Sequence, residues 1–239
     1  MSKDFTEIWV YLSASPLLGL TVTLASYLAG SWLFKKSGDN PLVNPVLIAV
    51  ASIVALLWMT GTPYETYFDG AQFVHFLLGP ATVALAIPLY NQFQQVKKTF
   101  GALVTALICG SVTAALSAIG IAWLLDGSKQ TLLSLAPKSV TTPIAMGITE
   151  KIGGLPSLTA VLVILTGIIG AVFGRIILNL VRVKDMRARG LAIGVASHGI
   201  GTAAALQASE VAGAFSGLAM GLNGIATAVL IPLLVTLLF

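Results

Sequence analysis

The sequence predicts an all-α polytopic membrane protein, and three observations support this fold class. Only 9% of the 239 residues are charged while 56% are hydrophobic, whereas a soluble domain carries about a quarter charged residues. Apolar runs of roughly 18 or more residues recur along the chain. The runs lack the period-two pattern of barrel strands, and an open sheet leaves unpaired edges in lipid. We therefore expect one transmembrane domain over residues 1–239.

We count about eight apolar segments. In order, they cover approximately residues 8–34, 41–59, 72–92, 100–125, 132–151, 155–181, 191–209 and 211–239. The first, second, fourth, sixth and eighth are long enough to cross about 30 Å of hydrocarbon at 1.5 Å per residue. The other three contain helix breakers, namely Gly79, Pro80 and Pro88 in the third, Pro137 and Pro143 in the fifth, and Gly194, Gly199 and Gly201 in the seventh.

Basic loops predict the orientation of these segments. Lys35–Lys36 and Lys97–Lys98 fall on one face if the first three segments cross, and the positive-inside rule makes that face cytoplasmic. Glu65 and Asp69 then lie in an outside loop. If all eight segments cross, however, the basic stretch "RVKDMRAR" is placed outside. Either the fifth segment enters and returns on the same side, which we favour, or it is a broken span that violates the rule.

The chain also resembles itself, with possible repeat units around 72–126, 132–182 and 190–239. "GPATVALAIPL" aligns with "APKSVTTPIAM", and Thr142 and Thr149 of the fifth segment align with Thr202 and Ser209 of the seventh. Transporters are commonly built from inverted repeats whose broken helices meet near the bilayer midplane. A fifth segment re-entering from outside and a seventh from inside would be related in this way. The alternative is a chance match between helices of similar low-complexity composition.

The break in the fifth segment predicts an anion site. A helix that restarts inside the membrane exposes backbone N–H groups, and its N-terminus attracts negative charge. The stretch "PKSVTTPIA" adds one cation and several hydroxyls, and a proline suited to a first helical turn. The candidate residues are Lys138, Ser139, Thr141, Thr142 and Pro143. A carboxylate is the natural guest, although Lys138 could instead snorkel to the interface.

The seventh segment has the same character. Its candidates are Ser197, His198, Gly199, Gly201 and Thr202, and Thr82 joins them because it aligns with Ser139 in the repeat. An imidazole can donate, accept or carry a proton near physiological pH, so His198 is the candidate for proton coupling. The alternative for each hydroxyl is a hydrogen bond within or between helices, and Asn223 is expected to join helices in the same way.

Other classes of function lack their motifs. The sequence has no HExxH, GxSxG or P-loop, and its two histidines have no paired carboxylates at metal-ligand spacing. We therefore expect no enzyme activity, no metal and no cofactor. The net charge of +4 gives no strong nucleic-acid signal, since the cations cluster in loops beside apolar runs.

Four stretches carry a resemblance to a known family. "LLGPATVALAIPLY", "LAPKSVTTPIAM", "GAVFG" and "ASHGIGTA" resemble signature stretches of the LrgB/CidB family, and the similarity extends over essentially the whole chain. The resemblance implies a bacterial inner-membrane protein that acts with a separate LrgA/CidA-type small membrane protein. It implies one of two functions. The first is transport of small monocarboxylates, as in the related plastid glycolate/glycerate carriers and in bacterial pyruvate transport. The second is holin/antiholin-like regulation of murein hydrolase activity and lysis.

The sequence departs from this family at one place. Members often have "GTAR" and a downstream acid where this chain has "GTAAALQ", so Ala204 stands at the arginine position and Gln207 near the acidic one. If the two groups pair, losing both is neutral, whereas loss of a substrate contact would weaken carboxylate binding. Taken together, the residues and the resemblance predict a carrier of glycolate, glycerate or pyruvate type with proton coupling. Gly-rich faces such as "GIIGAVFG" predict a homodimer.

Overall fold

The computed structural model describes residues 16–38, 40, 43–77, 80, 83–84 and 86–238, and every regular element within them is a helix. Backbone contacts divide the chain into two compact units, Met1–Ala84 and Leu85–Phe239. The predicted breaker Gly79 and the candidate Thr82 lie outside the described residues.

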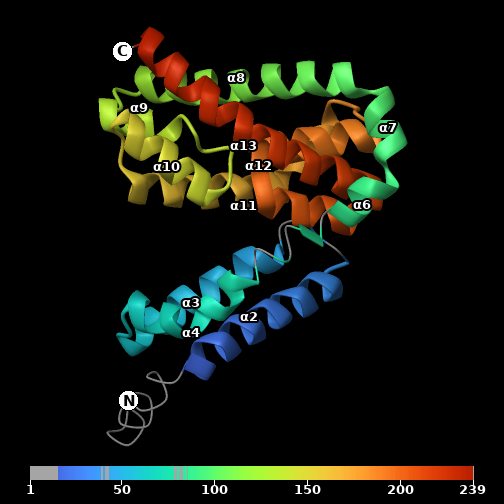
Figure 1. Ribbon diagram of the computed structural model, residues 1–239. Helices are drawn as coiled ribbons and strands as arrows, with labels where there is room; N and C mark the ends of the chain where they lie inside the picture. Colours follow the sequence, from blue (N-terminus) through green and yellow to red (C-terminus); the bar gives the residue numbers. More distant parts are fainter. Residues whose placement is uncertain are drawn as a thin grey trace, which may run out of the picture. The chain divides into compact units, whose positions relative to one another are not determined.

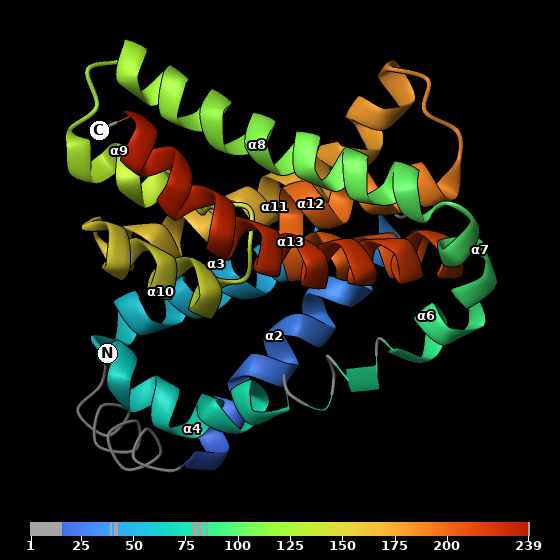
Figure 2. The ribbon, with the colours of Figure 1, turned by 45° about the horizontal axis from the view of Figure 1, so that its top comes forward.

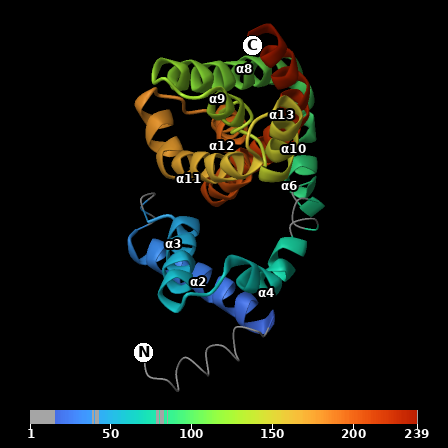
Figure 3. The ribbon, with the colours of Figure 1, turned by 90° about the vertical axis from the view of Figure 1, so that its left-hand side faces the viewer.

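Among the described residues, the helices of the first unit are α2 (Pro16–Lys36), α3 (Pro45–Thr60) and α4 (Tyr64–Phe76), and α2 packs against both others (Figure 3). Gly19 allows the close approach of α2 to α4, because a Cβ there would lie 2.6 Å from the Tyr67 carbonyl oxygen. Asn44 caps α3 by accepting the backbone N–H of Val46 at 2.9 Å.

Two predictions in this unit were wrong. Glu65 and Asp69 do not lie in a loop but in α4, which starts at Tyr64, directly after Pro63. A proline favours the start of a helix, and an acidic side chain in the first turn is favourable there, so the helix begins before its apolar run. Helix α3 is also only 16 residues long, shorter than the uninterrupted span expected for the second segment.

The second unit contains eight helices among the described residues. They are α6 (Ala86–Asn91), α7 (Phe93–Lys98), α8 (Phe100–Leu124), α9 (Lys129–Leu135), α10 (Thr142–Ile152), α11 (Pro156–Leu180), α12 (Met186–Ala208) and α13 (Glu210–Leu238). Five helices of the described chain are long and apolar enough to cross a membrane, namely α2, α8, α11, α12 and α13. The protein is therefore a polytopic membrane protein with an all-helical fold, as predicted.

Helix α13 runs through the whole second unit (Figure 2). Near its start, Ala212 packs with Ile193 of α12 and Leu178 at the end of α11. Near its end, Ile231 packs with Ile119 at the end of α8 and with Ile148 of α10. The ends of α13 therefore mark the two ends of the unit.

The chain from α9 to α10 doubles back on itself. Thr159, at the start of α11, donates to the Ser134 carbonyl at 3.0 Å and lies 2.9 Å from the Thr149 hydroxyl. The C-terminal ends of α9 and α10 are thus neighbours. The connection between the two helices reaches inward to the middle of α13 (Figure 1). We call residues 129–152 the α9–α10 hairpin and residues 136–141 its tip.

Helix α12 is also folded back. Ile193 and Ala205 belong to one buried cluster, although they would lie about 18 Å apart in a straight helix. The backbone breaks between them at His198, with φ 42° and ψ −136°. We call residues 186–208 the α12 hairpin and His198 its tip. Its first arm starts at Met186, five residues before the predicted start, because Asp185 caps the helix and the end of "RVKDMRAR" becomes helical.

Candidate functional site

The tips of the two hairpins meet at Asn223, in the middle of α13. The Asn223 side-chain amide donates to the Ser139 carbonyl at 3.3 Å and to the Val195 carbonyl at 3.1 Å. The break at His198 interrupts the helix that would otherwise supply a partner for Val195, so Asn223 satisfies an acceptor that the break leaves free. Only 1% of Asn223 is exposed, and its Oδ1 atom has no hydrogen-bond partner among the described residues. Asn223 therefore joins helices, as its place in the sequence suggested.

The tip of the α9–α10 hairpin places a cation beside the start of a helix. Lys138 is half-buried, and its Nζ lies 3.3 Å from the Ser139 hydroxyl. Helix α10 then begins at Thr142, and the Thr141 side chain makes no capping hydrogen bond to it. The first-turn N–H groups of α10 thus lack a side-chain cap, next to a positive charge. Both features favour an anionic guest.

The tip of the α12 hairpin holds a buried imidazole. The Nε2 atom of His198 lies 2.9 Å from the Val163 carbonyl of α11, and a carbonyl can only accept, so Nε2 carries the proton. The second ring nitrogen, Nδ1, has no hydrogen bond within the described residues. Val163 also belongs to one buried cluster with Val140, which lies in the tip of the α9–α10 hairpin two residues after Lys138. Two cations would repel each other here, and an anion between them would remove that repulsion.

Helix α11 makes room for this tip with glycines. A Cβ on Gly167 would lie 2.7 Å from the His198 ring, and a Cβ on Gly170 would overlap the Ser197 hydroxyl. A larger residue at either position would push the α12 hairpin away from α11. These two glycines therefore set the position of the imidazole.

Hydrogen bonds hold the second arm of the α12 hairpin to α13. The Thr202 hydroxyl donates to the His198 carbonyl at 2.8 Å and lies 2.9 Å from the Ser216 hydroxyl. Both side chains are buried. Thr202 thus connects the helix break to α13. This hydroxyl forms hydrogen bonds within and between helices, which is the alternative to substrate binding that the sequence left open.

Comparison with known proteins assigns the sequence to a family. The LrgB-like family matches residues 23–237, which include both hairpins. The chain belongs to the LrgB-like family. Its relatives include the Bacillus subtilis (strain 168) protein YwbG, 37% identical over 220 residues, which are 92% of this chain and 97% of that protein. The antiholin-like protein LrgB of Bacillus cereus (strain B4264) is 34% identical over 219 residues, which are 92% of this chain and 95% of that protein. No solved structure matches the chain.

The other predicted site residues of this LrgB-like protein are scattered. Pro143 and Gly199 are exposed, and Thr141 and Thr142 are half-buried. Gly201 is buried where the two arms of the α12 hairpin meet, since a Cβ there would lie 2.5 Å from the Ser197 Cβ. Lys138, Ser139, Ser197 and His198 are the candidates that the structure brings together at the tips.

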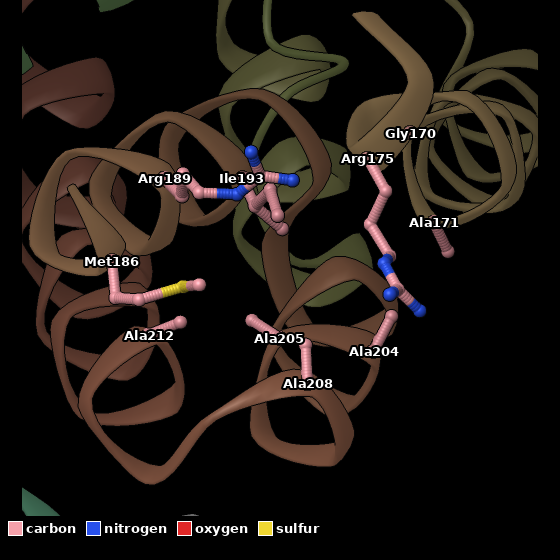
Figure 4. A pocket seen from close by; sticks show the side chains of 10 residues that line it. All are labelled: Gly170, Ala171, Arg175, Met186, Arg189, Ile193, Ala204, Ala205, Ala208 and Ala212. Atoms are coloured by element: carbon pink, nitrogen blue, oxygen red, sulfur yellow. The ribbon is translucent and has the colours of Figure 1, made fainter. Parts of the chain in front are cut away.

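Two arginines were absent from the predicted site. Arg175 and Arg189 line a cavity of about 80 Å³ between α11 and the arms of the α12 hairpin. The Arg175 side chain extends toward Ala204 (Figure 4), the position where the family resemblance predicts an arginine. A signal was present in the sequence, because Arg175 is the single charged residue of α11, and a charge inside an apolar span marks a functional candidate.

Proposed function

We propose that this protein carries small monocarboxylates of the glycolate, glycerate or pyruvate type across the bacterial inner membrane. The observation that carries the proposal is the meeting of two hairpin tips at Asn223, since Lys138 and His198 belong to these tips. Interrupted helices at membrane depth are tolerated where they are buried in protein or line a cavity, and they commonly form the substrate sites of transporters.

In this proposal the carboxylate binds at the start of α10. The uncapped N–H groups of its first turn and the Lys138 ammonium attract the anion. The hydroxyls of Ser139, Thr141 and Thr142 supply hydrogen-bond donors for the oxygens of one small acid. Charge-assisted hydrogen bonds of this kind are about twice as strong as neutral ones.

His198 is the proposed proton-coupling group. Because Nε2 holds its proton against the Val163 carbonyl, Nδ1 is the atom that gains and loses a proton. A carboxylate bound beside Lys138 favours the imidazolium. Substrate and proton would then bind together and leave together.

The arrangement also suggests how the chain lies in the bilayer. The arms of the α12 hairpin, Met186–Ser197 and Gly199–Ala208, reach about 18 and about 15 Å, roughly half of a hydrocarbon core of about 30 Å. We infer that this hairpin re-enters from the cytoplasm and the α9–α10 hairpin from outside. Thr99 and Arg187 line one cavity, so the last turn of α7, which contains Lys97 and Lys98, lies at the same end as residues 182–189. Both basic stretches then face the cytoplasm, as the positive-inside rule requires.

The two proposed re-entrant hairpins would also account for the predicted inverted repeat. Two elements that enter from opposite ends and meet at the middle are related by an axis in the membrane plane. A homodimer and an LrgA/CidA-type small membrane protein complete the proposed assembly. Exposed apolar side chains such as Trp123, Ile169 and Leu233 are available to lipid or to such partners.

A second candidate function comes from the relatives named antiholin-like protein LrgB. In that reading the protein regulates murein hydrolase activity and lysis through a partner. The proposal favours a carrier because regulation through a partner does not explain why two polar helix breaks meet inside the membrane.

Uptake into proteoliposomes tests the two functions together. The purified protein is reconstituted, and uptake of labelled glycolate, glycerate and pyruvate is followed with and without an inward proton gradient. We expect saturable uptake of at least one acid, strong loss in Thr142→Val, and loss of the response to the gradient in His198→Ala. The site assignment is wrong if both variants transport like the natural protein. Release of a trapped dye, with or without an LrgA-type partner, would instead favour the antiholin-like function.

A further inference from the structure

The cavity lined by Arg175 and Arg189 lies away from the hairpin tips. It opens between α11 and the two arms of the α12 hairpin, at the end where that hairpin begins and ends. Five alanine side chains and Gly170 form much of its lining, so the space is kept open by small residues. The alanines are Ala171, Ala204, Ala205, Ala208 and Ala212. A volume of about 80 Å³ holds several water molecules or one small anion.

The two arginines carry positive charge that nothing in the cavity balances. No acidic side chain is among the residues that line it, within the part of the chain that the structure describes. Arg175 makes no hydrogen bond or ion pair with any described residue. A guanidinium without a carboxylate partner at the edge of an apolar span is costly unless water or an anion solvates it.

Arg189 is held by hydrogen bonds, whereas Arg175 is exposed and has no hydrogen-bond partner among the described residues. The Arg189 Nη1 atom donates to the Asn179 Oδ1 and to the Val183 carbonyl, both at 2.8 Å. Its Nε and Nη2 donors make no hydrogen bond within the described residues. Arg175 approaches the cavity from α11 and points toward Ala204 (Figure 4). The cavity is thus lined by one anchored guanidinium and one exposed guanidinium without a partner among the described residues, and an anion between them would contact both.

We propose that this cavity is a second anion site, which takes the carboxylate of a small organic acid between Arg175 and Arg189. Fork-shaped guanidinium donors match the two oxygens of a carboxylate. The identity of the ligand rests on the proposed carrier function. In the proposed orientation, the cavity lies on the cytoplasmic side of the hairpin tips. It holds the acid on arrival at, or departure from, the α12 hairpin. Arg175, on α11, would also supply the guanidinium that the family resemblance places at position 204 of α12.

Ligand-dependent melting of the purified protein in detergent tests the site directly. Glycolate and pyruvate are titrated against the natural protein and Arg175→Gln, with chloride as the control anion. We expect both acids to raise the melting temperature, with a concentration dependence that shows two binding sites. In Arg175→Gln, one of the two sites should be lost or should bind the acid about tenfold or more weakly, as expected for a lost charge-assisted contact. Lys184→Gln is the matched control, because it removes a cation from the neighbouring loop without touching the cavity.

A rescue variant separates a binding role from a structural one. In Arg175→Ala, adding Ala204→Arg returns a guanidinium to the same cavity from α12 and should recover most of the lost acid-dependent shift. The site is disproved if Arg175→Gln and Lys184→Gln respond to the acids alike. It is also disproved if vesicles containing phosphatidylglycerol, and not the soluble acids, produce the Arg175-dependent shift, because the cavity would then hold a lipid phosphate.

Transport measurements distinguish failure of this site from failure of the carrier function. If proteoliposomes take up no acid but melting shows the Arg175-dependent component, the second site stands and the carrier proposal falls. If uptake is saturable and Arg175→Gln leaves its rate unchanged from both sides of the membrane, the carrier stands and the second site falls. We expect Arg175→Gln to lower the apparent affinity more from the cytoplasmic side than from the outside.

Discussion

The Asn223 side-chain amide donates to the Ser139 carbonyl, 3.3 Å away and 84 residues earlier in the chain. The same nitrogen also donates to Val195, on the first arm of the α12 hairpin. One amide thus holds both hairpin tips against α13. Movement of either tip requires these hydrogen bonds to change, so Asn223 couples the two halves of the proposed site.

Replacing Asn223 should therefore destabilise the fold and impair transport together. Asn223→Leu leaves two buried carbonyls without their donor, and each unsatisfied group costs about 1–3 kcal/mol. Unfolding in detergent measures the loss. Thr236→Val is the control, because that exposed hydroxyl bonds only to the Pro232 carbonyl of its own helix. Equal melting temperatures for the two variants would show that Asn223 does not hold the tips.

Glycines on α11 should differ sharply in their tolerance of a methyl group. In Gly170→Ala the new Cβ would overlap the Ser197 hydroxyl, whereas in Gly174→Ala it would lie 3.7 Å from the nearest atom of Ile193, an ordinary contact. Overpacking of this kind costs about 1–3 kcal/mol, while alanine in a helix gains about 0.5–1 kcal/mol over glycine. We expect Gly170→Ala to lower the melting temperature and Gly174→Ala to preserve or raise it. The reverse order would contradict the packing of α11 against the α12 hairpin.

The backbone at His198 should prefer glycine. Its φ of 42° lies in a region that costs a non-glycine residue about 1–3 kcal/mol. His198→Gly and His198→Ala both lose the hydrogen bond to Val163, but only the glycine variant also loses the strain. We expect His198→Gly to be the more stable by about 1–2 kcal/mol in chemical unfolding, and both variants to lose proton-coupled uptake.

Because glycine would fit the backbone at position 198 with less strain, the presence of histidine there indicates that the imidazole is required for function. If the glycine variant were no more stable than the alanine variant, the backbone would not be strained there. If it transported with normal proton coupling, His198 would have no role in coupling. The two readouts are independent, so each part of the interpretation can fail alone.

Asp185 caps the first helix of the α12 hairpin, and the stability that this cap contributes should depend on pH. Its side chain accepts the backbone N–H of Arg187 at 2.8 Å, and the hydrogen bonds from the Arg187 side chain, more than its charge, lower the pKa of Asp185 to about 2. Because the folded-state pKa is below its ordinary value near 4, the carboxylate stabilises the fold above about pH 4, and this contribution is lost as pH falls toward 2.

The matched variant for this prediction is Asp185→Asn, which keeps a good helix cap but no charge. The group is exposed, so we expect a difference of only about 0.5–1 kcal/mol at pH 7, which is lost as pH falls through the folded-state pKa of about 2. Unfolding of both proteins across this range measures it. A difference that stays constant with pH would show that the charge of Asp185 does not contribute.

The sequence was most informative where composition alone decides the structure. Long apolar runs predicted α8, α11 and α13 to within a few residues, because hydrocarbon thickness sets helix length. Pro137 and Pro143 located the break between α9 and α10. The start of α4 was missed, since Glu65 and Asp69 suggested a loop but favour a helical first turn.

The fold-back of α12 could not be predicted from local sequence. Glycines suggested a loosened helix, but the turn occurs at a histidine. Its ring is bonded to the Val163 carbonyl and fits beside Gly167, and its own carbonyl accepts from Thr202. These contacts come from distant parts of the chain. The cavity between Arg175 and Arg189 depends on the same fold-back, so sequence patterns could single out Arg175 as a lone charge in an apolar span but could not place Arg189 beside it.

The central claim is that a carboxylate binds at the start of α10, and site-directed labelling measures it most directly. In a Cys109→Ala background, because Cys109 is an exposed thiol, Thr142→Cys is labelled with a maleimide while glycolate is titrated. Glu150→Cys, at the exposed far end of the same helix, is the control. We predict that glycolate slows labelling at position 142 saturably, at the concentration that half-saturates uptake by the Thr142→Cys protein itself, and leaves position 150 unaffected. Saturable uptake without protection at position 142 would contradict it.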